Sequence, residues 1–331
     1  MCGIFGFYKL TDFNNCLSMD ELRKIIRYLA VANETRGRDS TGLAVVDAGA
    51  DVFTLRKTKP AGEFIQTGIV RDSLLSAITP ATKAVLGHTR SATTGEVTVK
   101  NAQPFTCGTV TGTHNGIVTN YAALFTRYTL KPETTCDSEV IFAMLAQSTT
   151  KQKRYLDAIE GFFSLAWYDT RTPDALNFAR TANDLAVYKD TQNRFLLYSS
   201  TETPLKLCAE IFELTLEPLT FPVNTLISIT KRGKLGRKQA LAPKFTYLSY
   251  DDDYLTPSGY RVTKHNVTDY SYTNRYPKAA YVSNGRANDR PKSCPYCHRS
   301  EKIYWSSSFQ QWLCNDCLSD LVSYANQTQG D

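Results

Sequence analysis

Cys2 is the residue whose position most directly suggests chemistry, because only Met1 precedes it in the sequence. Methionine aminopeptidase removes an initiating methionine when the next side chain is small, so Cys2 would then begin the mature protein. Its α-amine, with an ordinary pKa of about 7.7–8.0, can accept the proton of the neighbouring thiol near neutral pH. Cys2 would thus supply nucleophile and base for attack on an amide or acyl carbon. The alternative is a small buried residue at the start of a strand.

Two short stretches offer groups that such a nucleophile needs. In "GTHNGIVTN" (112–120), a predicted strand ends in Asn115 and Gly116, whose side-chain amide and backbone N–H could both donate to an oxyanion. The alternative for Asn-Gly is a tight turn. In "GHTRSATTG" (87–95), Arg90 follows an apolar strand and could bind a carboxylate through two parallel hydrogen bonds, the alternative being a surface arginine.

Asp137 begins the segment "DSEVIFAMLAQ" (137–147), which predicts an amphipathic helix. Aspartate is a preferred N-cap residue, so capping this helix is one expected role. A carboxylate at the same corner could also bind the α-ammonium group of an amino acid. The two roles are compatible.

Four cysteines near the end of the sequence suggest a metal site. The stretch "CPYCHRSEKIYWSSSFQQWLCNDC" (294–317) has two C-x-x-C pairs separated by sixteen residues, with a predicted hairpin between them. Four thiolates at this spacing suit tetrahedral Zn²⁺ in a structural role, with redox or disulfide chemistry as the alternative. Zinc would supply much of the folding free energy of so small a module. The predicted ligands are Cys294, Cys297, Cys314 and Cys317.

The first 230 residues must position the candidate catalytic groups, and their pattern predicts many strands with few helices. Besides residues 137–147, residues 18–30 predict a helix, with Ser18 and Glu21 in capping-box register. Numerous strands joined by hairpin-like links favour packed antiparallel sheets flanked by helices. The predicted strands are 3–8, 42–47, 52–56, 84–89, 162–168, 176–180, 194–199 and 225–230.

Taken in order, these motifs resemble one known family. Cys2-Gly-Ile, "RGRDSTG" (36–42), "GHTRSATTG", "THNGIVTN" and "CDSEV" (136–140) are similar to the glutaminase domain of class II glutamine amidotransferases, nearest to the glutamine:fructose-6-phosphate branch. The resemblance covers about residues 2–230. It implies an α+β fold, the four-layer αββα sandwich of N-terminal nucleophile hydrolases, to which the C-terminal cysteines add a small zinc-ribbon-like module.

The resemblance also implies roles for individual residues. Cys2 would attack the side-chain amide of glutamine, with Asn115 and Gly116 forming the oxyanion hole. The substrate-binding positions would be Arg90, Thr93 and Thr94 on the carboxylate side and, for the α-amino group, Asp137 with the Gly116 carbonyl. Arg36 matches a supporting residue behind the nucleophile.

Two departures from that branch concern the same loop. Ser91 stands where Trp is usual and Thr94 where His is usual. The Trp normally helps to close the site and to gate ammonia passage, so closure and coupling are expected to differ. The sugar-phosphate isomerase part that usually follows is also missing from this sequence, so the expected ammonia acceptor site lies on a separate partner or is absent.

Composition is that of an ordinary globular protein without a membrane span. The chain has 331 residues, 42% of them hydrophobic and 21% charged, with no uninterrupted apolar run of about 18 residues and no signal-peptide pattern. A reducing cytoplasm is therefore expected, or the cytoplasm of the host for a viral protein.

The net charge of +6 comes from the last hundred residues, with 15 Lys and Arg against 9 Asp and Glu in residues 231–331. Nucleic acid is therefore one candidate partner of this basic part.

These observations predict a domain plan and a ranked pair of functions. Residues 2–230 would form the glutaminase domain, 231–292 a basic, Tyr-rich linker, 293–320 the zinc module and 321–331 a tail. The expected function is a glutamine-hydrolysing subunit that delivers ammonia to a partner synthase, with nucleotide or nucleic-acid modification as one candidate outcome. A catalytically idle adaptor with the same fold is the main alternative. Another N-terminal nucleophile hydrolase is disfavoured because Arg90 and Asp137 fit a free amino acid.

Overall fold

The structure is a computed structural model that describes residues 2–10, 17–181, 183–220 and 222–244. It also describes the backbone of four short strands further along the chain. Contacts divide the chain into two compact units, 1–245 and 246–331. The candidate catalytic residues all belong to the first unit.

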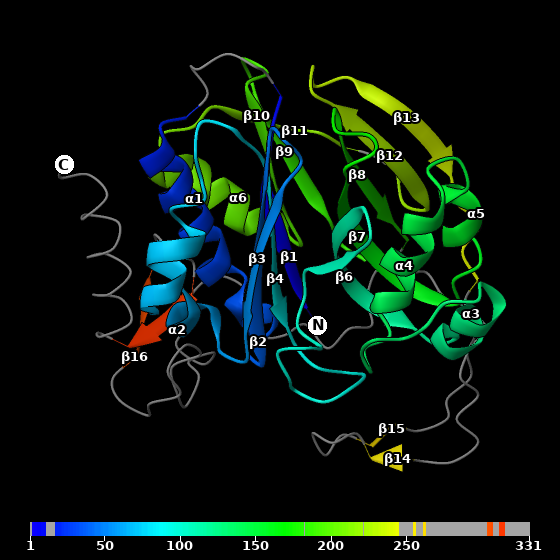
Figure 1. The fold of residues 1–331 in the computed structure, drawn as a ribbon. Helices are drawn as coiled ribbons and strands as arrows, with labels where there is room; N and C mark the ends of the chain where they lie inside the picture. Colours follow the sequence, from blue (N-terminus) through cyan, green and yellow to red (C-terminus); the bar gives the residue numbers. More distant parts are fainter. Residues whose placement is uncertain are drawn as a thin grey trace. The chain divides into compact units, whose positions relative to one another are not determined.

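Two antiparallel sheets form the centre of the first unit (Figure 1). The seven-stranded sheet has the order β11-β9-β10-β1-β4-β2-β3, and the six-stranded sheet has the order β13-β12-β8-β7-β6-β5. The strands of the first sheet are β1 (Gly3–Lys9), β2 (Ser40–Asp47), β3 (Val52–Lys57), β4 (Thr82–Arg90), β9 (Ala186–Asp190), β10 (Phe195–Ser199) and β11 (Leu216–Pro218). Those of the second are β5 (Phe105–Cys107), β6 (Val110–Val118), β7 (Gly161–Asp169), β8 (Ala175–Arg180), β12 (Thr225–Thr230) and β13 (Leu235–Ala240).

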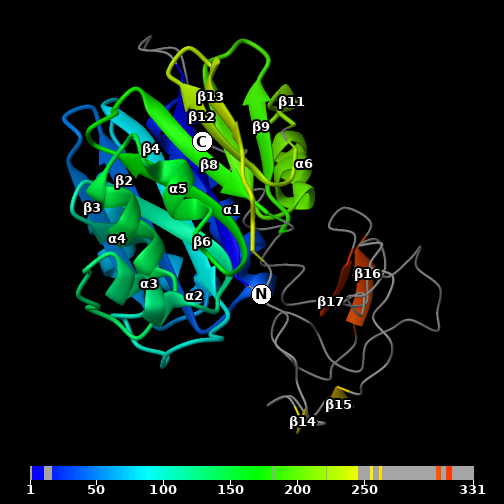
Figure 2. The same ribbon diagram turned by 90° about the vertical axis from the view of Figure 1, so that its right-hand side faces the viewer.

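Helices cover the outer face of each sheet, which gives the predicted αββα layering (Figures 1 and 2). Short 3₁₀ and π-helical segments lie at Glu34–Arg36 and Val70–Leu74. The helices on the first sheet are α1 (Met19–Ala32), α2 (Ala61–Gln66) and α6 (Glu202–Ile211). Those on the second sheet are α3 (Tyr121–Arg127), α4 (Glu139–Gln147) and α5 (Gln152–Leu156).

The predicted local signals of α1 and of the central strands are confirmed. Ser18 caps α1 through a capping box with Glu21, which typically stabilises a helix end by about 1 kcal/mol. Strand β1 is buried on both faces, which explains its continuous apolar run. Gly6 of β1 is required by close approach, because a Cβ there would lie 2.0 Å from the Val85 carbonyl oxygen.

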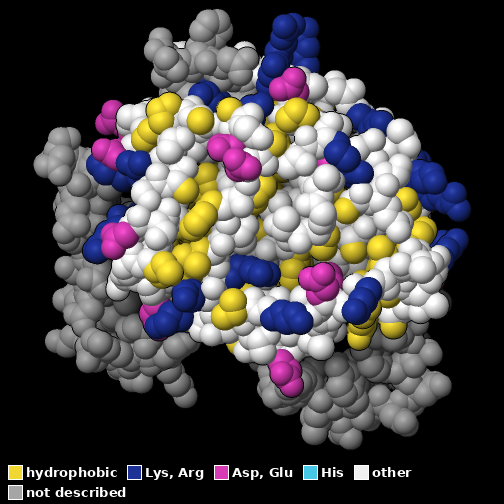
Figure 3. Space-filling view, in the orientation of Figure 1, with side chains coloured by type: hydrophobic (Ala, Val, Ile, Leu, Met, Phe, Trp, Pro, Cys, Tyr) yellow, Lys and Arg dark blue, Asp and Glu magenta, His cyan; other side chains and the backbone are white. Residues whose placement is uncertain are grey.

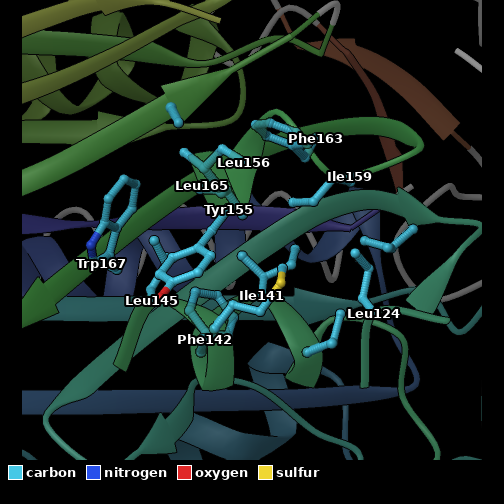
Figure 4. Close-up of a cluster of buried hydrophobic side chains, with 14 of the residues drawn as sticks. Leu124, Ile141, Phe142, Leu145, Tyr155, Leu156, Ile159, Phe163, Leu165 and Trp167 are labelled. Carbon is cyan, nitrogen blue, oxygen red and sulfur yellow. The ribbon is translucent and has the colours of Figure 1, made fainter. Parts of the chain in front are cut away.

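Clusters of buried hydrophobic side chains among the described residues hold the layers together. One lies between the sheets and joins β1, β4 and β10 to β7, β8 and β12 through residues such as Ile4, Leu86, Tyr198, Phe178 and Ile227. Another lies between the second sheet and its helices, where Phe142 and Leu145 of α4 pack with Trp167 of β7 (Figure 4). Burial of such aromatic side chains is the main stabilising contribution to a core of this type. The cores fix β1, β4, β6 and α4, the elements next to the candidate site.

The predicted domain boundary at residue 230 is wrong. Strand β13 extends the second sheet beyond that point by pairing antiparallel with β12 along Thr225 to Ile229. Its Arg237 and Lys238 made the segment resemble a basic linker, but charged residues are common on edge strands, where they oppose unwanted sheet pairing. On the face shown in Figure 3, Lys and Arg side chains are dispersed over the surface, without forming one dominant patch.

The second unit contains two described strand pairs. Strands β14 (Tyr254–Leu255) and β15 (Arg261–Val262) pair antiparallel, as do β16 (Ile303–Ser306) and β17 (Gln311–Cys314). The β16–β17 pairing confirms the hairpin predicted between the two C-x-x-C pairs. Cys294, Cys297 and Cys317 lie outside the described residues, and only the backbone of Cys314 is described. None of the described helices combines the length and the apolar character needed to cross a membrane.

Candidate active site

Cys2 lies immediately before β1, beside the end of β4. Gly3 of β1 pairs with Thr89 of β4, so Cys2 lies next to the point at which the chain leaves β4. The backbone N–H of Ser91 donates to Cys2 Sγ over 3.4 Å, and the thiol can donate to the Ser91 carbonyl at the same separation. Both contacts use the Ser91 backbone, so the nucleophile is positioned by main-chain geometry.

Burial controls the protonation of this thiol. Desolvation raises the pKa of Cys2 above its ordinary value, while the Ser91 N–H and the positive charge of Arg90 act in the opposite direction. Asp137 adds a smaller upward effect. The thiol is therefore protonated at neutral pH, and nucleophilic attack requires a base that removes its proton. The influence of Arg90 and Asp137 on this pKa also places both charges within electrostatic range of Cys2.

The "RGRDSTG" motif holds the two chain segments that meet at the nucleophile. Arg36 Nε donates to the Cys2 carbonyl over 2.9 Å. The backbone N–H of Asp39 donates to the Arg90 carbonyl over 2.9 Å, and its carboxylate accepts from the Ala92 N–H over 2.7 Å. Arg36 therefore contacts the backbone of Cys2, and its supporting role in catalysis stays a prediction.

Asn115 and Gly116 lie within β6, which continues to Val118, so the tight-turn alternative for this dipeptide is wrong. Asn115 is 2% exposed, and its Nδ2 has no hydrogen-bond partner among the residues that the structure describes. A buried amide donor without a partner is costly, and one beside a nucleophile fits a group that awaits a transient anion. Gly116 has φ of +154°, and a Cβ there would lie 2.0 Å from the Phe162 carbonyl oxygen. Only glycine fits this position.

Arg90 is buried at the end of β4, and its guanidinium binds the loop that follows. Nη1 donates to the Glu96 carbonyl over 2.9 Å, and Nη2 donates to the carbonyls of Thr94 and Gly95 over 2.7 and 3.2 Å. These contacts shape residues 94–96 around the guanidinium. They contradict the alternative of an ordinary surface arginine. Thr93 is exposed, whereas Thr94 is half-buried and contacts Arg90 through its carbonyl oxygen.

Asp137 reaches back to β6 instead of capping α4. Its Oδ2 accepts from the Val118 N–H over 2.7 Å, and the carboxylate is 3% exposed. Ser138 is the N-cap residue of α4, so the predicted capping role of Asp137 is wrong. The bond places the Asp137 carboxylate beside Val118, two residues after Gly116 on β6. Binding of an amino group by Asp137 stays a prediction.

A buried polar cluster, which sequence reasoning missed, supports β6 next to Asn115. The Gln103 amide accepts from the His114 N–H over 2.7 Å and donates to the His114 carbonyl over 3.2 Å, as a neighbouring strand would. His114 Nδ1 lies 2.7 Å from Ser138 Oγ, at the start of α4. His88 Nε2 lies 3.1 Å from the same His114 carbonyl. A carbonyl can only accept, so His88 carries its proton on Nε2.

His88 links the two sheets of the site. It belongs to β4, which ends at Arg90, whereas His114 belongs to β6, which carries Asn115. Burial lowers the pKa of His88 to about 3, so this ring is neutral throughout the physiological range. The cluster consequently keeps its hydrogen bonds at any pH at which the protein is expected to operate.

Together these groups can perform acyl chemistry on a small amino acid amide. Cys2 lies beside the end of β4, which carries Arg90. The His88–His114 contact joins β4 to β6, which carries Asn115 and, at its end, the bond to Asp137. No cluster of three or more metal-ligating side chains occurs among the residues described with their side chains. The described part of the site therefore offers a nucleophile and charged binding groups, without a metal-ligand set.

Comparison with known proteins agrees with this geometry. Residues 88–206 match the family model described as a glutamine amidotransferase domain, a range that includes Arg90, Asn115, Gly116 and Asp137. The chain carries a class II glutamine amidotransferase domain.

Curated relatives of the amidotransferase domain are larger proteins. The chain is 34% identical over 199 residues to a glutamine–fructose-6-phosphate aminotransferase (isomerizing) of Salmonella paratyphi A, covering 56% of this chain and 30% of the relative. The chain is 29% identical over 211 residues to the enzyme of the same name in Aliivibrio fischeri, and the match covers 59% of this chain and 31% of that relative. The chain thus spans about a third of the length of these relatives.

Solved structures support the fold. The allosteric regulatory enzyme of purine biosynthesis matches with a TM-score of 0.57 at 19% identity, over 72% of this chain and 49% of that one. Glutamine phosphoribosylpyrophosphate amidotransferase from B. subtilis matches with a TM-score of 0.54 at 16% identity, with the same coverage. At these identities the likeness concerns the fold alone.

Proposed function

We propose that the amidotransferase domain hydrolyses L-glutamine to L-glutamate and ammonia with Cys2 as nucleophile. The observation that carries this proposal is the Nδ2 of buried Asn115 on β6, which has no hydrogen-bond partner within the described part of the chain, together with the half-buried, protonated thiol of Cys2. An oxyanion formed by thiol attack on an amide would supply the partner that this donor lacks. Cys2, Asn115 and Gly116 are accordingly the proposed catalytic residues.

The proposed substrate-binding groups distinguish glutamine from a peptide amide. Arg90 uses three N–H donors for the 94–96 loop, and its buried positive charge would attract the α-carboxylate, with Thr93 beside it. Asp137 and the Gly116 carbonyl would bind the α-ammonium group. Thr94 would act through its position in the loop that Arg90 binds. A free amino acid presents both charges, whereas an internal peptide residue presents neither.

The proposed reaction has two acyl-transfer steps. After removal of Met1, the α-amine of Cys2 accepts the thiol proton, and sulfur attacks the δ-carbon of glutamine while the carbonyl electrons move to oxygen. Asn115 Nδ2 and the Gly116 N–H stabilise that oxyanion. Its collapse expels ammonia, which takes the proton from the α-ammonium, and leaves a γ-glutamyl thioester. Water then attacks the thioester, the α-amine accepts its proton, and collapse returns the thiol and releases glutamate.

The first test measures glutamate release by protein whose N-terminus has been shown by mass spectrometry to be Cys2. We expect kcat/KM to rise with pH through about 7.7–8.0 and then level off, because the α-amine must be neutral to accept the thiol proton. The raised pKa of the half-buried Cys2 thiol makes this base necessary. The matched control is the same protein with Met1 retained, which should be inactive. Equal activity in the protein that retains Met1 would contradict the role of the α-amine as base. Processed protein without glutaminase activity would favour the catalytically idle adaptor.

We also propose that the released ammonia is transferred to an acceptor. The names of the curated relatives describe transfer to fructose 6-phosphate. For this chain we infer an acceptor that a partner protein activates. Nucleotide or nucleic-acid modification remains one candidate, on the strength of the basic residues after position 230.

We also propose that Cys294, Cys297, Cys314 and Cys317 bind one structural Zn²⁺. The β16–β17 hairpin between the two C-x-x-C pairs supports this, because a hairpin can bring the two pairs to one ion. A cytoplasmic location would keep these thiols, and Cys2, reduced.

We expect about one zinc ion per chain by inductively coupled plasma mass spectrometry, and a large loss of zinc in Cys297→Ser. Cys208→Ser is the matched control, because Cys208 is a buried thiol of α6. It should retain full zinc content. Metal-free wild-type protein, or an unchanged zinc content in Cys297→Ser, would refute the assignment.

A further inference from the structure

We propose that Asn183 is a positioning residue for the oxyanion hole, an inference that rests on the proposed function. Asn183 lies between β8 and β9, outside every motif that identified the site. Its Nδ2 donates to the Asn115 carbonyl over 2.7 Å. Both side chains are buried, at 7% and 2% exposure. The two residues are 68 positions apart in the sequence, so the tertiary fold creates this contact.

The contact acts on the peptide unit that supplies the second oxyanion donor. The Asn115 carbonyl and the Gly116 N–H belong to the same planar trans peptide, in which C=O and N–H point in opposite directions. A donor that holds the carbonyl therefore also fixes the direction of the N–H. Gly116, at φ of +154°, lacks the steric restriction that a side chain would impose on this backbone. The bond from Asn183 supplies a restraint instead.

Asn183 is itself held in place by the strand next to Asn115. Ser164 of β7 lies directly opposite Asn115 in the β6–β7 register. Its hydroxyl contacts the Asn183 carbonyl at 3.1 Å and the Asp184 carbonyl at 3.0 Å. Ser164 is completely buried. The loop that carries Asn183 is thus tied to the same strand pair whose peptide it orients, which forms a closed set of contacts.

This arrangement predicts a defect confined to the transition state. Misdirection of the Gly116 N–H weakens a hydrogen bond that is strong only when charge develops on the substrate oxygen. Glutamine binding relies on Arg90 and Asp137, neither of which is hydrogen-bonded to Asn183 in the structure. Loss of the Asn183 donor should therefore lower kcat and leave KM nearly unchanged.

The test compares Asn183→Asp, which replaces the donating NH₂ by an acceptor of the same size, with Asn183→Ala. We expect kcat to fall about tenfold or more, less than the 10²–10³ of a direct donor, with KM within about twofold of wild type. Alkylation of Cys2 by iodoacetamide, followed on the N-terminal peptide, should keep its rate. This displacement forms no oxyanion, so it reports an intact nucleophile independently of the oxyanion hole.

The matched control is Asn177→Asp, which makes the same change at a buried asparagine of β8 in the same sheet. It should retain kcat. Unchanged kcat in both Asn183 variants would overturn the inference, as would parallel losses of kcat, substrate binding and Cys2 alkylation, which indicate general disruption. If processed wild-type protein releases no glutamate while Cys2 is alkylated normally, the proposed function itself fails, and this inference fails with it.

Discussion

Cys2→Ala is expected to reduce glutamate release by at least about 10⁴-fold while leaving the fold intact. The substitution removes the sulfur that forms the thioester, and loss of a nucleophile eliminates nearly all of the rate enhancement of a covalent mechanism. Cys2 lies before β1 and is half-buried, and its thiol bonds to the Ser91 backbone, so replacement by the small Ala side chain should cost little packing. The measurement is steady-state glutamate production, with thermal unfolding recorded for both proteins.

The matched control is Cys107→Ala. Cys107 is a half-buried thiol like Cys2, but it lies on β5 against the helix-side core of the second sheet, and burial raises its pKa to about 12. This variant should keep its activity. Comparable losses in the two variants would show that activity depends on thiols in general, or on stability, and would count against Cys2 as the nucleophile.

Asn115→Ala is expected to lower kcat by about 10²–10³-fold with little change in KM. The Nδ2 donor has no protein partner in the described structure, so its removal should cost little stability, in contrast to the usual loss of a buried hydrogen bond. Steady-state kinetics and urea unfolding of the same samples separate these effects. A variant with unchanged kcat, or one that loses several kcal/mol of stability, would show that the amide has a structural role.

The residues around the nucleophile could largely be predicted from the sequence, because local patterns encode them. Cys2 is marked by its position after Met1, and Arg90 by its place at the end of an apolar strand. The strands and helices that carry them follow from apolar periodicity and from the capping box of α1. These signals concern neighbours in the chain, so they are available without a structure.

The supporting shell could not be predicted, because its contacts join residues that are distant in the chain. Gln103 mimics a strand neighbour of His114, and Asn183 bonds to Asn115 across 68 positions. A polar residue before proline, such as Gln103, is a weak signal on its own. The predicted capping of α4 by Asp137 is wrong for the same reason, because the carboxylate instead accepts a tertiary hydrogen bond from Val118.

Ser91 illustrates how the structure limits the effect of a departure from the family pattern. The usual residue at this position is Trp, whose ring helps to close the site. In this chain the contacts with Cys2 Sγ come from the Ser91 backbone, which any residue can provide. The nucleophile is therefore held independently of the side chain at position 91. Differences from larger relatives are expected in ammonia transfer, not in thioester formation.

The most direct test of the central claim is to quench the processed protein with acid during glutamine turnover and to map its peptides by mass spectrometry. The account predicts a γ-glutamyl group on the peptide that begins with Cys2, which disappears once glutamine is exhausted and never forms in Cys2→Ala. Glutamate production without an adduct on that peptide, or with the adduct on another cysteine, would contradict it.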